Sequence, residues 1–204
     1  DRADAVLKGL PAAEDASGDS LEQRRAQYAY RREFAEGAKW FEALRASAPV
    51  QDWEPYQHAK LELALGDFRR WNGDAASARE DYEAAAAMLR DRADADSLDS
   101  DALALSAIAY SGLGDREGAL RYASRLAGVP LAVDGVNGAI GRQSIARTLA
   151  RLGDRDAAIA ALERVVKEPS TVTTDALRLD PDYDALRGDP RFERLLASGM
   201  TPLE

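Results

Sequence analysis

The sequence predicts an all-α protein made of repeated helix-turn-helix units and closed by a C-terminal capping segment. The clearest observation is an eight-residue stretch that occurs twice, as LGDREGAL at residues 113–120 and as LGDRDAAI at residues 152–159. A second observation is the regular spacing of four candidate turn positions: Arg32, Gly73, Gly114 and Gly153. These positions are 41, 41 and 39 residues apart. A period near 40 residues, with two helices in each unit, is typical of a helical solenoid.

The candidate turns contain residue types that end one helix and begin the next. Glycine adopts the left-handed conformation of a helix C-cap without a steric penalty. An aspartate follows in Gly114-Asp115 and in Gly153-Asp154, where its side chain can cap the next helix. The first unit has Arg32 in place of glycine. We therefore expect the first unit to be the least regular.

The apolar spacing and the turn residues together place the helices in order. We expect helices at about residues 20–31, 34–46, 53–72, 74–90, 101–112, 115–127, 136–152 and 154–167. The aspartate-rich stretch 91–101 is predicted to be a connector, and Ser20 with Gln23 is predicted to form a capping box for the first helix. This gives three regions. Residues 1–19 are an N-terminal extension or the remnant of a preceding repeat, 20–169 are an array of about four helix pairs, and 170–204 are a cap.

The C-terminal region has the composition of a lid for the last repeat. A terminal repeat needs a cap because its apolar flank would otherwise face water. The apolar residues expected to cover that flank are Leu177, Leu179, Tyr183, Leu186, Phe192, Leu195 and Leu196. Asp189-Pro190 is expected to start the final helix, because proline is tolerated in a first turn.

Composition and charge exclude several classes of function. The net charge of −9 argues against a nucleic-acid interface, which needs clustered lysine and arginine. The chain has no cysteine, so disulfides and thiolate chemistry are excluded. Its longest apolar stretches, such as residues 84–89, are far shorter than the roughly 20 residues of a membrane span. No initiator methionine precedes Asp1, and we expect the chain to be a piece of a longer protein.

The residues do not assemble a recognisable catalytic or metal-binding motif. His58 is the sole histidine and sits among Gln57, Ala59 and Lys60, whereas a metal site would need more ligands nearby. A calcium loop starting at Asp94 fails, because its fifth and sixth positions are Leu98 and Asp99. The glycine-containing stretches lack the Gly-Lys-Ser/Thr ending of a phosphate loop. We therefore expect no catalytic residues, no metal and no cofactor, and hence no enzyme.

The residues also carry a resemblance to a known family. Counted from each turn, small residues recur at Gly37, Ala78, Ala119 and Ala158, and larger ones follow four positions later at Phe41, Tyr82 and Leu162. This looks like the pattern of tetratricopeptide repeats. The tail LRLDPDYDALRGDPRFERLL at residues 177–196 is similar to the closing segment of a group of bacterial multidomain signalling proteins. In that group a tetratricopeptide array accompanies a Ser/Thr kinase, an adenylate cyclase or a winged-helix regulator with a TolB-like region.

The resemblance implies a right-handed tetratricopeptide-like solenoid that serves as an interaction module of a bacterial signalling protein. It implies binding of a protein or peptide in the concave groove, or self-association as a homodimer, and it favours the periplasmic side of a membrane-anchored parent. No nucleic acid and no membrane insertion by this segment are expected. The residues expected to face the groove are Tyr30, Asp67, Arg70, Trp71, Gln143, Arg147 and Arg151.

Two alternatives stay open at this point. Trp71 lies on the apolar stripe of its helix and is equally well placed for the core. The module could instead be a small-ligand sensor, with a pocket near Tyr183 and Phe192 between the array and its cap. For the groove hypothesis, replacing Arg147 and Arg151 by glutamate is expected to weaken binding of an acidic partner without unfolding the domain.

Overall fold

The computed structural model describes residues 18–47, 50, 52–129, 137–167 and 173–198. Within these ranges all regular elements are helices, so the predicted all-α class is confirmed. Eight of the described helices form four successive pairs: α2 (Gly18–Tyr30) with α3 (Phe34–Arg45), α4 (Pro55–Trp71) with α5 (Ala75–Ala95), α6 (Ser100–Gly112) with α7 (Arg116–Ala127), and α8 (Asn137–Arg151) with α9 (Arg155–Lys167).

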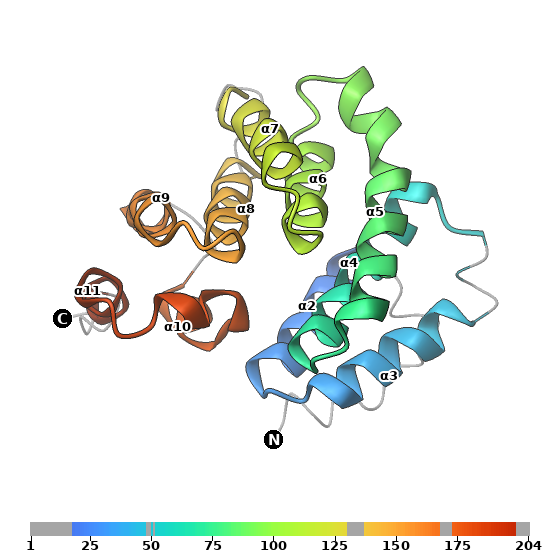
Figure 1. Ribbon diagram of the computed structural model, residues 1–204, viewed down its shortest axis with the longest axis horizontal. Helices are drawn as coiled ribbons and strands as arrows, with labels where there is room; N and C mark the ends of the chain where they lie inside the picture. The colour runs from blue at the N-terminus through green and yellow to red at the C-terminus, as the bar shows by residue number, and fades with distance from the viewer. Residues whose placement is uncertain (1–17, 48–49, 51, 130–136, 168–172, 199–204) are drawn as a thin grey trace.

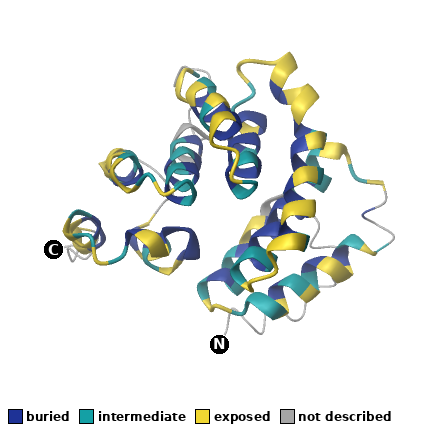
Figure 2. Ribbon diagram, in the orientation of Figure 1, coloured by how far each residue is buried: buried dark blue, intermediate teal, exposed yellow. Residues whose placement is uncertain are grey.

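The pairs stack in two layers (Figure 1). The inner layer consists of the first helices of the pairs, and α2 packs on α4, α4 on α6, and α6 on α8. The outer layer consists of the second helices, and α3, α5 and α7 each contact the inner helix of the following pair. Buried residues follow the lines where neighbouring helices meet, and exposed residues lie on the outer faces (Figure 2). This arrangement is the one that a helical repeat array requires.

The four predicted turns share one backbone geometry. Arg32, Gly73, Gly114 and Gly153 all have positive φ, between 60° and 86°. In each turn the next residue donates its backbone N–H to the carbonyl five residues earlier, as in Asp74 to Arg69 at 2.9 Å. This bond satisfies a carbonyl that the helix end would leave unpaired.

The aspartates after the three glycines cap the second helices. Asp74, Asp115 and Asp154 accept hydrogen bonds from backbone N–H groups three residues later. In the first turn Glu33 holds this position, and its side chain makes no capping hydrogen bond. The first unit therefore departs from the repeat in its turn residue and in its cap, as the sequence indicates.

Tyr82 of α5 shows why small residues recur in the array. Its ring lies between Gly66 of α4 and Gly112 of α6. A Cβ atom on Gly66 would come within 3.0 Å of the ring, and one on Gly112 within 2.6 Å. Close approach of these helices thus depends on the missing side chains. The ring is fully buried, and its hydroxyl reaches the inner layer.

Three sequence predictions about this part of the chain were wrong. Helix α5 continues to Ala95, so the connector is shorter than the predicted stretch 91–101. The helix extends this far because Ala93 is buried against the next pair and Asp94 forms an ion pair with Arg125 at 2.9 Å. Helix α2 already begins at Gly18, which places Ser20 inside the helix and not at its N-cap. Leu179 is 44% exposed and does not join the core of the cap.

The C-terminal segment closes the array. It consists of α10 (Thr174–Leu179), the short 3₁₀ helix η2 (Pro181–Leu186) and α11 (Pro190–Ser198), whose start at Pro190 is as predicted. Helix α11 packs on α9, η2 packs on α8 and α9, and α10 reaches α2 (Figure 1). The last segment of the chain thereby contacts the first helix of the array.

The fit of Tyr82 generates a stability prediction. Gly112→Ala places a methyl group against the rigid Tyr82 ring and is expected to lower the free energy of unfolding by about 1–3 kcal/mol. The matched control is Gly141→Ala in α8, where the nearest atom, at 3.3 Å, belongs to the flexible end of Leu126. Urea unfolding of both variants checks the prediction. Equal stability of the two variants would contradict it.

Candidate functional site

Charged side chains from both ends of the array meet on its inner surface. Arg25 comes from α2, Asp67 and Arg70 from α4, and Arg147 and Arg151 from α8. The C-terminal segment adds Asp180, just before η2, and Asp182 within it. We call these seven residues the arginine–aspartate cluster.

Asp182 is the centre of this cluster. Its side chain has no exposed surface. The guanidinium group of Arg151 donates a hydrogen bond to each of its two carboxylate oxygens, at 3.0 and 2.7 Å. Arg70 lies 2.5 Å from the same carboxylate, Arg147 3.2 Å and Arg25 3.3 Å. Arg25 and Asp182 are 157 residues apart in the chain. One carboxylate therefore ties the first, second and fourth helix pairs to the C-terminal segment.

Asp67 forms the second centre. Arg151 donates to one of its oxygens at 2.6 Å, and Arg25 donates to the other at 2.9 Å. The Tyr82 hydroxyl donates to the first oxygen at 2.7 Å. The glycines that admit the Tyr82 ring thereby also position a hydrogen bond within the cluster.

The charges compensate the cost of burial. Burial alone would raise the pKa of Asp182, but Arg151, Arg70 and Arg147 outweigh it and hold the pKa well below its ordinary value. The pKa of Asp67 is likewise lowered, because Arg151 and Arg25 outweigh its burial. Both carboxylates are therefore ionised at neutral pH. Buried charges are tolerated only with such pairing, and removing one partner typically costs about 3–5 kcal/mol.

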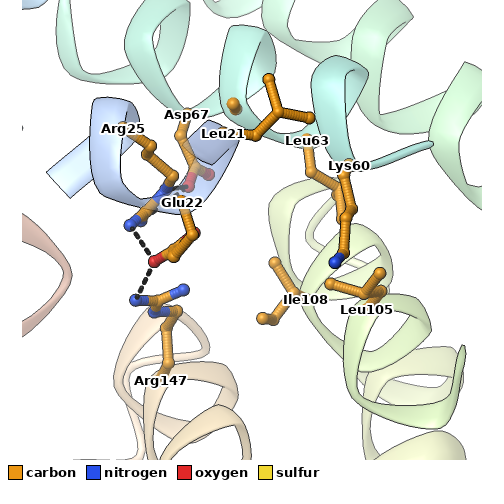
Figure 3. A pocket seen from close by; sticks show the side chains of 10 residues that line it. Leu21, Glu22, Arg25, Lys60, Leu63, Asp67, Leu105, Ile108 and Arg147 are labelled. Atoms are coloured by element: carbon orange, nitrogen blue, oxygen red, sulfur yellow. Dashed lines mark hydrogen bonds and ion pairs between the residues drawn. The ribbon is translucent and has the colours of Figure 1, made fainter. Parts of the chain in front are cut away.

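A small pocket lies beside the cluster, between α2, α4, α6 and α8 (Figure 3). Its volume is about 60 Å³. The residues that line it are Leu21, Glu22, Arg25, Lys60, Leu63, Ala64, Asp67, Leu105, Ile108 and Arg147. Glu22, Arg25 and Arg147 lie on one side, and Lys60, Leu63, Leu105 and Ile108 lie on the other. We call this the inner pocket.

The seven residues predicted to face the groove lie in or around the cluster. Asp67, Arg70, Arg147 and Arg151 belong to it. Tyr30 is half-buried near Asp180, and Gln143 lies near the Tyr183 hydroxyl. The structure thus brings the predicted residues together, but the C-terminal segment covers the charged ones. Whether a partner binds at these residues stays a prediction.

Trp71 belongs to both environments that the sequence allowed. Its ring packs on Phe34 and Phe68 at the edge of the first core, with centroids 5.4 and 5.5 Å away. The guanidinium groups of Arg25 and Arg70 lie 5.2 and 5.4 Å from its centroid. Cations at this distance are attracted to the face of an indole. Trp71 therefore connects the core to the cluster.

Sequence reasoning missed Arg25, Asp180 and Asp182 as members of this site. The one signal for Arg25 in the sequence is that a charged residue at this position departs from the tetratricopeptide pattern. The apolar residues of the tail predict a lid, and Asp180 and Asp182, which flank Pro181 within it, carry no local sign of their buried partners. Their partners lie 31 to 157 residues away, a distance that no local motif reveals. The expectation that replacing Arg147 and Arg151 by glutamate leaves the domain folded also changes. Both arginines pair with buried aspartates, so these substitutions are expected to lower the stability of the fold as well as to affect binding.

The cluster holds its charges in ion pairs between helices and the C-terminal segment. No group of three or more His, Cys, Asp or Glu side chains in the described ranges could hold a metal ion. Across those same ranges, no helix combines the length and the apolar content needed to cross a bilayer. The cluster joins helices, and the inner pocket offers an apolar wall facing a charged one.

A second charged group lies between α3, α4 and α5. Asp81 is buried there, 2.6 Å from Arg69 and 3.3 Å from Arg45, with Glu62 close by. Burial, reinforced by the negative charge of Glu62, outweighs the two arginines and raises the pKa of Asp81 to about 6. Asp81 differs in this respect from Asp67 and Asp182.

Comparison of the chain with family models, with curated proteins and with solved structures finds no match in any of the three. The tetratricopeptide resemblance therefore stays a prediction, and so do the right-handed sense of the solenoid and the bacterial signalling context.

The cluster gives a prediction for Asp182. Asp182→Asn keeps the shape but removes the charge that faces four guanidinium groups, and it is expected to lower the free energy of unfolding by about 3–5 kcal/mol. Asp175→Asn is the matched control, because that side chain is 83% exposed and lies 3.9 Å from Arg178. Surface pairs of this kind contribute about 0–1 kcal/mol. Urea unfolding measures both, and a small effect of Asp182→Asn would show that the cluster does not hold the ends together.

Asp81 gives a pH prediction. Its folded pKa of about 6 lies above the unfolded value of 3.8, so the unfolded chain loses this proton first as pH rises. The contribution of Asp81 to the free energy of unfolding should therefore increase by about 1 kcal/mol when the pH falls from 7 to 5. Asp67 and Asp182 have lowered pKa values, and their contribution is lost only below pH 4. Urea unfolding at both pH values should show the increase in the wild type and not in Asp81→Asn.

Proposed function

We propose that this chain is a noncatalytic interaction module with a tetratricopeptide-like array, and that it binds a segment of a protein partner at the inner pocket. The observation that carries the proposal is the position of the pocket on the inner layer, where successive helices α2, α4, α6 and α8 each contribute lining residues. A preorganised helical surface lowers the ordering cost of binding.

The inner pocket is a better candidate than the arginine–aspartate cluster itself. Arg70 and Arg151 are engaged by Asp182, and Arg147 is engaged by both Asp180 and Asp182. A partner that replaced these contacts would have to extract Asp182 from its fully buried position. The pocket needs no such rearrangement, because Lys60 and Leu105 are already half-exposed on its wall.

The size of the pocket supports a protein segment over a metabolite. Pockets for drug-sized ligands measure about 300–1,000 Å³. The inner pocket, at about 60 Å³, suits one side chain of a longer segment that lies across the inner surface. The alternative of a sensor pocket near Tyr183 and Phe192 has less support, because both rings are fully buried in the core of the cap.

The resemblance of the tail and of the repeats supplies the wider context of this proposal. On this proposal the module belongs to a bacterial signalling protein, in which the array presents a docking surface and another domain carries the output activity. The inner-layer pocket supports the docking part of this proposal.

Binding at the inner pocket is tested by Leu105→Glu. Random dodecapeptides displayed on phage are selected on the wild-type protein, and affinities of the enriched peptides are then measured on the variant. A charge on the apolar wall is expected to weaken their binding by about tenfold or more. The matched control is Leu98→Glu, since Leu98 is 48% exposed and lies outside the pocket lining.

The control should bind the peptides like the wild type, and thermal unfolding of both variants checks that the fold is kept. Two results would contradict the proposed site. One is a selection that enriches no peptide. The other is a set of enriched peptides that bind Leu105→Glu as tightly as the wild type.

A further inference from the structure

The cluster that forms the charged wall of the inner pocket contains more positive than negative charges. The arginine–aspartate cluster contains four guanidinium groups and three carboxylates, so one positive charge is left over within it. Burial makes such an excess costly unless another negative group compensates it. Two of the four arginines, Arg25 and Arg147, line the pocket.

Glu22 supplies that compensation from the rim of the pocket. Its carboxylate lies 3.2 Å from Arg25 and 3.9 Å from Arg147, and it bridges the two guanidinium groups (Figure 3). The Glu22 side chain is 61% exposed, whereas the side chains of Arg25 and Arg147 are 5% and 12% exposed. Exposed ion pairs contribute only about 0–1 kcal/mol. The aspartates of the cluster fix the positions of Arg25 and Arg147. Glu22 is the exposed additional partner of both arginines, and a carboxylate held this weakly is easily replaced.

The opposite wall offers a complementary surface. Leu63 and Ile108 provide aliphatic contact, and the Lys60 ammonium lies 4.9 Å from the centre of the Tyr56 ring. Within the described ranges Lys60 forms no ion pair. The pocket thus has Arg25 and Arg147 on one side, and aliphatic side chains together with Lys60 on the other (Figure 3).

We propose that the inner pocket recognises a partner segment in which an acidic side chain stands next to an aliphatic one. The acidic group takes the place of Glu22 on Arg25 and Arg147, and the aliphatic side chain packs on Leu63 and Ile108. A second acidic group on the segment pairs with Lys60. This inference rests on the proposed function and adds the chemistry of the partner.

The overall charge of the chain makes this preference easy to distinguish from non-specific attraction. A protein with a net charge of −9 attracts basic peptides through its general field. Selection of acidic peptides runs against that field. It therefore requires a local cationic site.

The test uses Glu22→Gln in the full chain, with Glu36→Gln as the matched control on an exposed position of α3 outside the pocket lining. The probes are the dodecapeptides selected on the wild-type protein that lose binding to Leu105→Glu. These peptides are expected to contain Asp or Glu beside Leu, Ile or Val. Removing the competing carboxylate should tighten their binding to Glu22→Gln by about 3- to 10-fold.

The control should leave their affinity unchanged, and replacement of their acidic residues by the corresponding amides should abolish the gain. Enriched peptides that depend on Leu105 but are neutral or basic would overturn the acidic preference and leave the proposed function standing. Unchanged or weaker binding of acidic peptides to Glu22→Gln would also overturn it. Absence of any peptide that depends on Leu105 would instead remove the proposed function.

Discussion

The buried carboxylate of Asp182 connects parts of the chain that the repeat architecture alone would leave apart. A stacked array brings each helix pair into contact with its neighbours only, and its two ends have no intrinsic reason to meet. Here Arg25 and Arg70 from the first half and Arg147 and Arg151 from the last pair converge on one side chain. The positions of Arg25 and Arg147 on the wall of the inner pocket follow from this convergence.

The packing of the outer layer and the charges of the inner layer are linked through Tyr82. Its ring needs the space left by Gly66 and Gly112, and its hydroxyl donates to Asp67. Asp67 in turn accepts hydrogen bonds from the guanidinium groups of Arg25 and Arg151. A glycine at the contact between two helices therefore helps to orient two arginines of the cluster. The same residues of the second repeat therefore serve both helix packing and electrostatics.

Local features of the chain were readable from the sequence, and distant ones were not. The turns at Gly73, Gly114 and Gly153 were predictable because glycine followed by aspartate has a direct conformational meaning. The end of α5 was misplaced because aspartates in the 91–101 stretch suggested a connector, although Asp94 is held in the helix by Arg125. The tertiary contact outweighed the local preference there.

The candidate site was predictable only in part for the same reason. Helical spacing indicated that Arg147 and Arg151 share one face with Gln143. It could not indicate that this face meets Asp180 and Asp182, because that contact depends on how far the array curves. Glu22 carried no sequence signal at all, and its interest comes from the two buried guanidinium groups that it bridges.

The contact between α10 and α2 has a consequence for how the molecule unfolds. Open repeat arrays lose their terminal units one at a time, because each end is held by a single neighbour. In this chain, fraying of α2 would remove Arg25 from Asp67 and Asp182, and release of η2 would remove Asp182 from Arg70 and Arg151. Either end is therefore protected by the other, and the array should open as one cooperative unit even though its parts are repetitive.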